Sequence, residues 1–113
     1  MKTFGKVLRE LRRHREVSQR ELAEKVNVDF SYISKLENDR LPPPAADTIL
    51  NICNVLNSPP DELLALSGKM PTALRKVFAS SPAALAFVRT AKELRLTEQE
   101  WKDLVEQIKN LRE

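Results

Sequence analysis

Apolar residues recur at three- and four-residue intervals along most of this chain, which is the spacing of amphipathic helices. The first such run extends from Thr3, a suitable N-cap, to about His14, with Phe4, Leu8 and Leu11 on one face. Only 2 glycines and few β-branched residues are present, which favours helices over a sheet. The pattern therefore predicts a helical protein from its first segment onward.

Two short helices are predicted between residues 18 and 38, separated by a turn of about three residues. Ser18 and Glu21 have the spacing of a capping box, in which each side chain accepts a hydrogen bond from the other residue's backbone N–H. Asn27 tolerates the left-handed conformation that ends many helices, and Asp29 suits the N-cap of the second helix. Helices joined by so short a turn have the dimensions of a helix-turn-helix, whose second helix can enter a DNA major groove.

Helical patterns continue beyond this pair, interrupted by segments that contain proline. Pro42–Pro44 cannot continue a helix, and Lys69-Met70-Pro71 marks a boundary. Thr97 and Glu100 have the spacing of another capping box. The later helices are expected at about residues 46–56, 58–67, 72–79, 82–94 and from 98 onward. We therefore predict an all-α protein, with a five-helix domain over residues 1–68 and about three helices over residues 69–113.

The composition excludes several classes of site. One cysteine, Cys53, excludes an internal disulfide, and together with one histidine, His14, it leaves too few ligands for a structural zinc site. No glycine-rich phosphate loop and no cluster of metal ligands are present, so we expect no catalysis, metal or cofactor. No apolar stretch approaches the ~18–20 residues needed to cross a membrane, and no signal peptide is recognisable. A cytoplasmic protein without membrane contact is expected.

Basic residues concentrate at the start of the chain, although the net charge is only +3 and the pI about 9.2. The first fifteen residues hold six Lys or Arg residues against the single acidic Glu10. This excess is compatible with a basic surface near DNA phosphates. It is equally compatible with the ordinary charge of a solvated helix.

Segments of the chain resemble the signature of the lambdoid-repressor-like (Cro/C1, XRE) helix-turn-helix family. The similar residues extend over Phe4–Gly68 and include Ser18-Gln19, Glu21-Leu22-Ala23, Val28 and Ile33–Asn38. The resemblance implies a five-helix fold whose third helix reads DNA. It also implies that Arg12 and Glu37 form a structural ion pair. The family often has glycine in three turns that here contain Glu16, Asn27 and Asp39, and the conformation at Glu16 is left open.

The resemblance also implies which side chains contact double-stranded DNA. Gln19, at the first turn of its helix, is expected to donate to a phosphate, or else to be an ordinary surface glutamine. Phe30 is a candidate for a thymine methyl contact, or for packing against the turn. Lys35 can donate to guanine O6 or N7, or to a phosphate. The remaining candidates contact a base edge or the DNA backbone: Ser31, Tyr32, Ser34, Asn38 and Arg40.

An apolar stripe in the last helix is the candidate for a dimer interface, or for a small core of the C-terminal region itself. It consists of Trp101, Leu104, Val105, Ile108 and Leu111. The preferred interpretation is a sequence-specific transcriptional regulator, a dimeric repressor that binds a palindromic operator. Its expected partners are DNA, a second copy and a regulatory protein, either a metallopeptidase or a toxin. The alternatives are the antitoxin of a toxin–antitoxin pair and a protein-interaction adaptor on the same fold.

Overall fold

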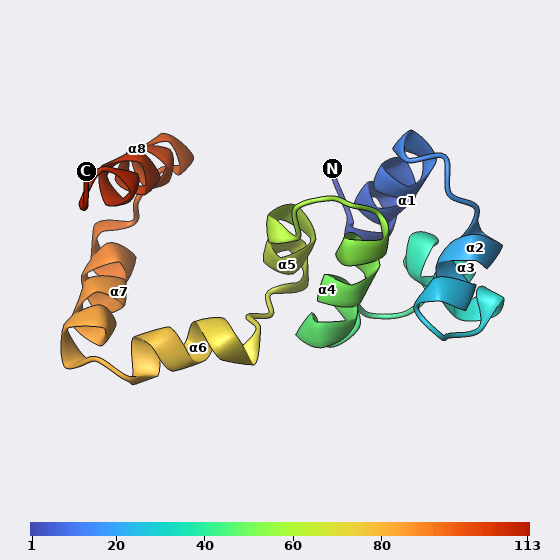
Figure 1. Cartoon of the computed structure of the whole chain (residues 1–113), viewed down its shortest axis with the longest axis horizontal. Coiled ribbons are helices and arrows are strands. Elements are labelled where there is room, and N and C mark those ends of the chain that lie inside the picture. Colours follow the sequence, from blue (N-terminus) through green and yellow to red (C-terminus); the bar gives the residue numbers. More distant parts are fainter. The chain divides into compact units, whose positions relative to one another are not determined.

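The computed structural model describes all 113 residues and contains eight α-helices and no strand (Figure 1). The predicted all-α class is therefore confirmed. The chain divides into two compact units, Met1–Pro71 and Thr72–Glu113, and each is described separately. The first unit contains α1 (Phe4–His14), α2 (Gln19–Lys25), α3 (Phe30–Glu37), α4 (Ala46–Val55) and α5 (Asp61–Ser67). The second contains α6 (Thr72–Ala79), α7 (Pro82–Leu94) and α8 (Glu98–Lys109).

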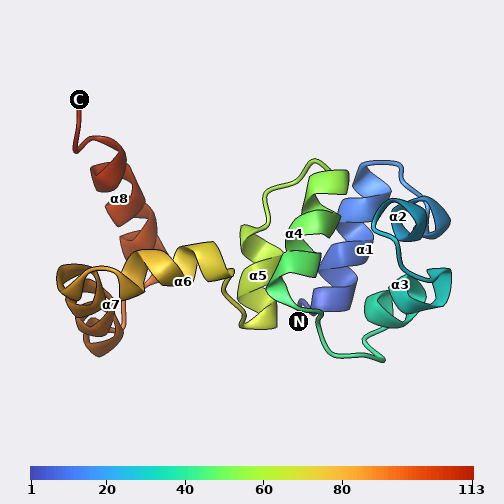
Figure 2. The ribbon, with the colours of Figure 1, turned by 60° about the horizontal axis from the view of Figure 1, so that its bottom comes forward.

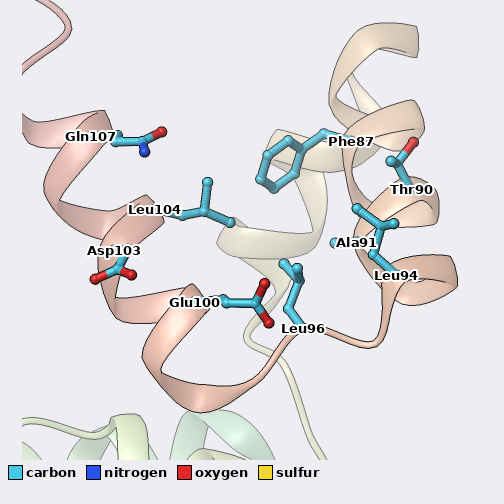
Figure 3. A pocket seen from close by; sticks show the side chains of 9 residues that line it. All are labelled: Phe87, Thr90, Ala91, Leu94, Leu96, Glu100, Asp103, Leu104 and Gln107. Atoms are coloured by element: carbon cyan, nitrogen blue, oxygen red, sulfur yellow. The ribbon is translucent and has the colours of Figure 1, made fainter.

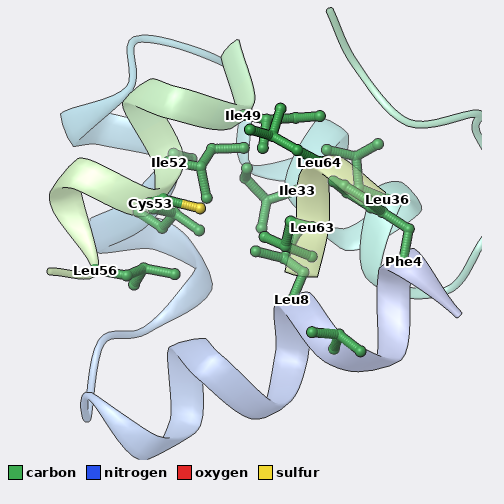
Figure 4. Close-up of a cluster of buried hydrophobic side chains, with 13 residues drawn as sticks. Phe4, Leu8, Ile33, Leu36, Ile49, Ile52, Cys53, Leu56, Leu63 and Leu64 are labelled. Carbon is green, nitrogen blue, oxygen red and sulfur yellow. The ribbon is translucent and has the colours of Figure 1, made fainter. Parts of the chain in front are cut away.

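One hydrophobic core joins the five helices of the first unit. Helix α1 packs against α3 and α5, and α4 packs against α2 and α5 (Figure 2). Each helix supplies at least one side chain that is almost completely buried, and Figure 4 shows those of α1, α3, α4 and α5 converging. Full burial of a leucine or isoleucine side chain contributes about 1.5–3 kcal/mol. The central members are Leu8, Leu22, Ile33, Ile49, Ile52 and Leu63.

Only some helices of the first unit have a side-chain hydrogen bond at the N-cap. The hydroxyl of Thr3 accepts from the Lys6 N–H at 3.1 Å, and that of Ser18 accepts from the Glu21 N–H at 3.0 Å. The predicted capping box at Ser18 is half formed, because the Glu21 side chain makes no return bond. Asp29 occupies the N-cap position of α3 but its side chain makes no capping hydrogen bond.

Four turns of the first unit contain a non-glycine residue in the left-handed region. Glu16 has φ 57°, Asn27 has φ 59° and Asp39 has φ 56°. Asparagine and aspartate adopt this conformation at modest cost, whereas for other side chains it costs about 1–2 kcal/mol. The turn at Glu16 therefore keeps the left-handed geometry and is strained. Asn57, at φ 49°, follows the same pattern after α4.

Specific residues also define the end of α5 and hold the segment that follows it. Gly68 ends the helix at φ 68°, as glycine commonly does. The Lys69 ammonium then donates to the carbonyl oxygens of Pro43 and Pro44, both at 2.9 Å. This pair of bonds ties the segment after α5 to the loop after α3. Leu66 is 37% exposed, because α5 buries only the side that carries Leu63 and Leu64.

The second unit leaves most of its apolar side chains open. Leu74, Val77, Leu85 and Val88 are between 41% and 59% exposed. Helices α6 and α7 pack against each other, but this contact leaves these four side chains open. Ala91 is the one buried apolar residue of the unit. The capping box of Thr97 and Glu100 is fully formed.

A cleft of about 330 Å³ lies between α7 and α8 (Figure 3). Phe87 and Leu104 face each other across it, and Leu94 and Leu96 line its base. Glu100 and Asp103 place carboxylates at its edge. The apolar stripe of α8 is thus divided, since Leu104 turns toward the cleft while Trp101, Val105, Ile108 and Leu111 are 40–77% exposed. None of the eight helices combines the length and the apolar character needed to cross a membrane.

Candidate nucleic-acid interface

A buried ion pair joins α1 to the last residue of α3. Arg12 Nε donates to Glu37 Oε2 at 2.6 Å, and Arg12 Nη2 donates to Glu37 Oε1 at 2.9 Å. Arg12 is 8% and Glu37 1% exposed. Burial alone raises the pKa of Glu37, but the hydrogen bonds from Arg12 and Gln19 and the charge of Arg12 outweigh it and hold this pKa below its usual value. The pair expected from the resemblance is therefore charged and has two well-aligned hydrogen bonds.

Two further side chains converge on the same carboxylate. Gln19 Nε2 donates to Glu37 Oε1 at 3.0 Å, and Arg9 Nε donates to that oxygen at 3.4 Å. Gln19 was expected to direct its amide to a phosphate, and one of its two N–H groups is engaged here with Glu37. The second N–H remains free for another acceptor. Glu37 thus connects α1, α2 and α3 through one buried group.

The residues just after α3 are anchored to the start of α1. Asp39 Oδ1 accepts from the Gly5 N–H at 2.9 Å, and Asp39 Oδ2 accepts from the Thr3 hydroxyl at 2.6 Å. The hydrogen bond from Thr3 lowers the pKa of Asp39. A Cβ on Gly5 would lie 2.6 Å from the Glu37 carbonyl oxygen and closer still to that of Leu36. Only glycine permits this approach between the two helices.

Asn38, a candidate for a DNA backbone contact, uses both ends of its side chain within the protein. Its Nδ2 donates to the Ser34 carbonyl oxygen at 2.9 Å, and its Oδ1 accepts from Arg9 Nη2 at 2.8 Å. Arg9 therefore links Glu37 and Asn38. The role of Asn38 in this arrangement is to end α3 and fix it to α1.

The outward face of α3 has a different character. Phe30 is 41% exposed, Ser31 and Lys35 are exposed, and the side chains of Ser31 and Lys35 make no hydrogen bond within the protein. Ser31 and Lys35 are one turn apart and lie on the same face. Ser34 and Tyr32 are half-buried, and burial raises the pKa of Tyr32. Arg40 is exposed in the loop that follows.

A shallow hollow of about 430 Å³ lies beside Phe30, between the end of α1 and the starts of α2 and α3. Arg13, Ser18, Gln19 and Arg20 line it, so it combines basic groups with the free N–H groups of the first turn of α2. The guanidinium carbon of Arg20 is 4.6 Å from the centroid of the Phe30 ring. Such a surface suits the phosphates and base edges of a nucleic acid.

The sequence did not single out Gly5, Arg9, Arg20 or Asp39 for these contacts. Gly5 stands within a helix, where an isolated glycine is unfavourable unless another segment approaches closely. That was the one signal available for the contact between α1 and α3. Arg9 and Arg20 occur among many basic residues, and nothing in their spacing separates them from ordinary surface charge.

Comparison with known proteins agrees with this geometry. A family model described as helix-turn-helix matches residues 8–63, the region from α1 to α5. This domain belongs to the XRE-type helix-turn-helix family. The predicted family is thus confirmed, and its members are DNA-binding transcriptional regulators.

One curated relative is the uncharacterized HTH-type transcriptional regulator RghRB of Bacillus subtilis (strain 168). It is 38% identical over 68 residues, which are 60% of this chain and 49% of the relative. The chain therefore spans about half the length of that relative.

Two solved structures share the fold. The crystal structure of SinR, the master regulator for biofilm formation, in complex with DNA is 29% identical with a TM-score of 0.52, and the match covers 55% of this chain and 98% of that one. A SinR–SinI protein complex is 21% identical with a TM-score of 0.54, and the match covers 95% of both chains. The second comparison concerns the fold alone, and it extends into the helices of the C-terminal unit.

Proposed function

We propose that this chain is a sequence-specific transcriptional regulator that binds double-stranded DNA as a dimer, with α3 in the major groove. The observation that carries this proposal is the contrast between the two sides of α3. Its inner side is fixed by Arg9, Arg12 and Glu37, while Ser31 and Lys35 on its outer side have no partner in the protein. The likeness to SinR, whose crystal structure contains DNA, supports the same conclusion.

The expected contacts divide into positioning and reading. Gln19, Ser34 and Arg40 are placed near the edges of the interface and suit phosphates, which fix the register on the duplex. Phe30, Ser31 and Lys35 suit base edges: a thymine methyl for the ring and hydrogen-bond acceptors for the hydroxyl and the ammonium. So few reading residues recognise only a short half-site. A specific operator then requires two copies with their α3 helices about one helical turn, ~34 Å, apart.

The second copy is proposed to dock on the C-terminal unit. Trp101, Val105 and Ile108 lie on one face of α8 and are 40–58% exposed, with Leu111 beyond them at 77%. Exposed apolar residues at helical spacing are typical of an interface between helices. A dimer bound across a promoter excludes polymerase, so repression is the simplest mode of action.

Selection of bound DNA from a random pool tests the proposal directly. We expect a palindromic consensus with half-sites about one turn apart, and binding that weakens steeply with salt. Lys35→Ala serves as the variant that should relax the consensus at one base pair, and Lys102→Ala on α8 is the matched control that should retain the full consensus. Binding without any consensus, or no binding, would contradict the proposal and favour the adaptor alternative.

The oligomeric state tests the role of α8. Sedimentation equilibrium should give a dimer for the native chain and a monomer for Val105→Asp with Ile108→Asp, both of which are exposed and not needed for folding of the first unit. An unchanged dimer would assign the stripe to another partner. A regulatory protein, such as the metallopeptidase or toxin considered above, would then be the occupant, and its co-purification with the native chain but not with this variant would identify it.

A further inference from the structure

Arg20 and Phe30 form a stacked pair at the front of the candidate interface. Arg20 lies in the first turn of α2 and Phe30 is the first residue of α3, with 4.6 Å between the guanidinium carbon and the ring centroid. Both are exposed, and Arg20 makes no ion pair and no hydrogen bond within the protein. The ring face is therefore the one contact that fixes the Arg20 guanidinium.

Stacking leaves the hydrogen-bonding groups of Arg20 free. A cation–π contact uses the flat face of the guanidinium, while its N–H donors point outward in the plane. Restricting the side chain before DNA arrives reduces the conformational entropy lost on binding. A guanidinium oriented in this way matches the two acceptors of guanine, O6 and N7, in the major groove.

The geometry also relates the two side chains, Arg20 and Phe30, to each other. Phe30 starts the helix that enters the groove, and its exposed ring surface suits the thymine methyl. The guanidinium carbon lies 4.6 Å from the ring centroid, so the two side chains are in direct contact. Two side chains in contact at this spacing contact neighbouring bases rather than distant ones.

We propose that Arg20 and Phe30 act as one specificity-determining unit that reads a thymine next to a guanine in each half-site. This inference rests on the proposed function, because it requires α3 to enter the groove. Arg20 is the base-reading residue, and Phe30 both contacts the thymine methyl and positions Arg20. The competing role for Arg20 is a phosphate contact, as expected for an unstacked arginine in the same hollow.

The test uses the full-length chain and a labelled duplex carrying the consensus found by random-pool selection. Three duplexes are compared: the consensus, the same duplex with uracil in place of the thymine, and the same duplex with 7-deazaguanine in place of the guanine. Each is titrated with the native protein and with Arg20→Lys, Phe30→Leu and the double variant. Arg13→Lys is the matched control, because Arg13 lines the same hollow without stacking on a ring. Circular dichroism establishes that each variant is folded.

We expect the native protein to bind the 7-deazaguanine duplex about 5- to 150-fold more weakly than the consensus, the range for a bidentate base contact. The uracil duplex should bind about 4-fold more weakly, the effect of one buried methyl group. Arg20→Lys should lose discrimination at the guanine, and Phe30→Leu should lose it at both bases because it also releases Arg20. Arg13→Lys should weaken all three duplexes by the same factor. This pattern would support the proposal that Arg20 and Phe30 recognise the two bases as one unit.

Two results would overturn it, and they are distinguishable. A consensus with equal weakening of all duplexes by Arg20→Lys makes Arg20 a phosphate contact, and the proposed function stands. Independent effects of the two substitutions, with Phe30→Leu retaining discrimination at the guanine, also refute the proposal that Arg20 and Phe30 act together. The absence of any consensus refutes the proposed function itself together with this inference.

Discussion

The backbone N–H of Gly5 donates a 2.9 Å hydrogen bond to the Asp39 carboxylate, and this bond joins the start of α1 to the second residue after the end of α3. The contact is close because Gly5 has no side chain. A methyl group there would meet the Glu37 carbonyl oxygen at 2.6 Å. The position of the end of α3 against α1 therefore depends on a glycine in α1.

Gly5→Ala should destabilise the first unit by about 1–3 kcal/mol, although alanine favours helices, because two of the obstructing atoms are backbone carbonyl oxygens that cannot turn away. Urea unfolding measures the loss. The matched control is Gly68→Ala, where φ is 68° but no atom lies within 4 Å of the added methyl. That variant should lose only about 1 kcal/mol from conformational strain. Equal losses at both positions would show that the close approach is unimportant.

Removing one member of the Arg12–Glu37 pair should cost roughly 3–5 kcal/mol, because the other charge then stays buried without its main partner. Glu37→Leu leaves Arg12 without a carboxylate, and Arg12→Met leaves Glu37 with only the contacts from Arg9 and Gln19. Both Arg12→Met and Glu37→Leu are expected to show this cost in chemical denaturation. The double variant removes both charges and should recover much of the loss. If the double variant were as unstable as the sum of the single ones, the coupling energy would be zero and the two charges would not compensate each other.

Acid should destabilise the domain through Glu37. Its pKa is lower in the folded state than in the unfolded chain, so the unfolded state binds more protons on acidification. The stability that Glu37 contributes is complete above the unfolded value of about 4.3 and is lost as the pH falls through the lower folded value. Urea midpoints between pH 7 and pH 3 should fall less steeply in Glu37→Gln than in the native chain. Identical slopes would exclude Glu37 as the source.

Lys35→Ala should weaken binding to the consensus operator by about 1–3 kcal/mol and relax the preference at one base pair. Its ammonium is exposed and has no partner in the protein, so it is free to donate to guanine or to phosphate. Titration against operators changed at single positions measures both effects. Equal weakening on every sequence would show that Lys35 contacts phosphate alone.

Glu16→Gly should stabilise the first unit by about 0.5–1 kcal/mol, because glycine adopts φ near 57° without strain and Glu16 is exposed. Thermal unfolding measures the gain. Asn27→Gly is the comparison at φ 59°, and it should gain less because asparagine already tolerates this region. A larger gain at Asn27 would argue against local strain at Glu16.

Local signals in the sequence predict much of this fold. Thr3, Ser18 and Thr97 indicate helix starts, because the hydroxyl of each accepts a hydrogen bond from the backbone N–H three residues later. Apolar residues at helical spacing, such as those around Leu8, Ile33 and Ile52 in their respective helices, indicate the buried faces. Each of these features depends on residues close together in the chain, so the sequence alone is sufficient to recognise it.

Contacts between residues that are far apart in the sequence are harder to predict from the sequence alone. The bond from Gly5 to Asp39 and the stacking of Arg20 on Phe30 depend on how helices are placed, and neither residue pair has a spacing that reveals it. The second unit shows the same limit. The spacing of Leu85 and Val88 indicates an apolar face, but spacing does not indicate what covers that face, and within one chain it is open.

The residues that fix α3 and the residues that face outward from it are different sets. Glu37, Asn38 and Asp39 bond to α1, whereas Ser31 and Lys35 bond to nothing in the protein. We therefore expect substitutions at the outward positions to leave the fold intact while altering which DNA the proposed regulator prefers. A lineage of such proteins can diversify its target genes by changing a few codons, without passing through unfolded ancestors.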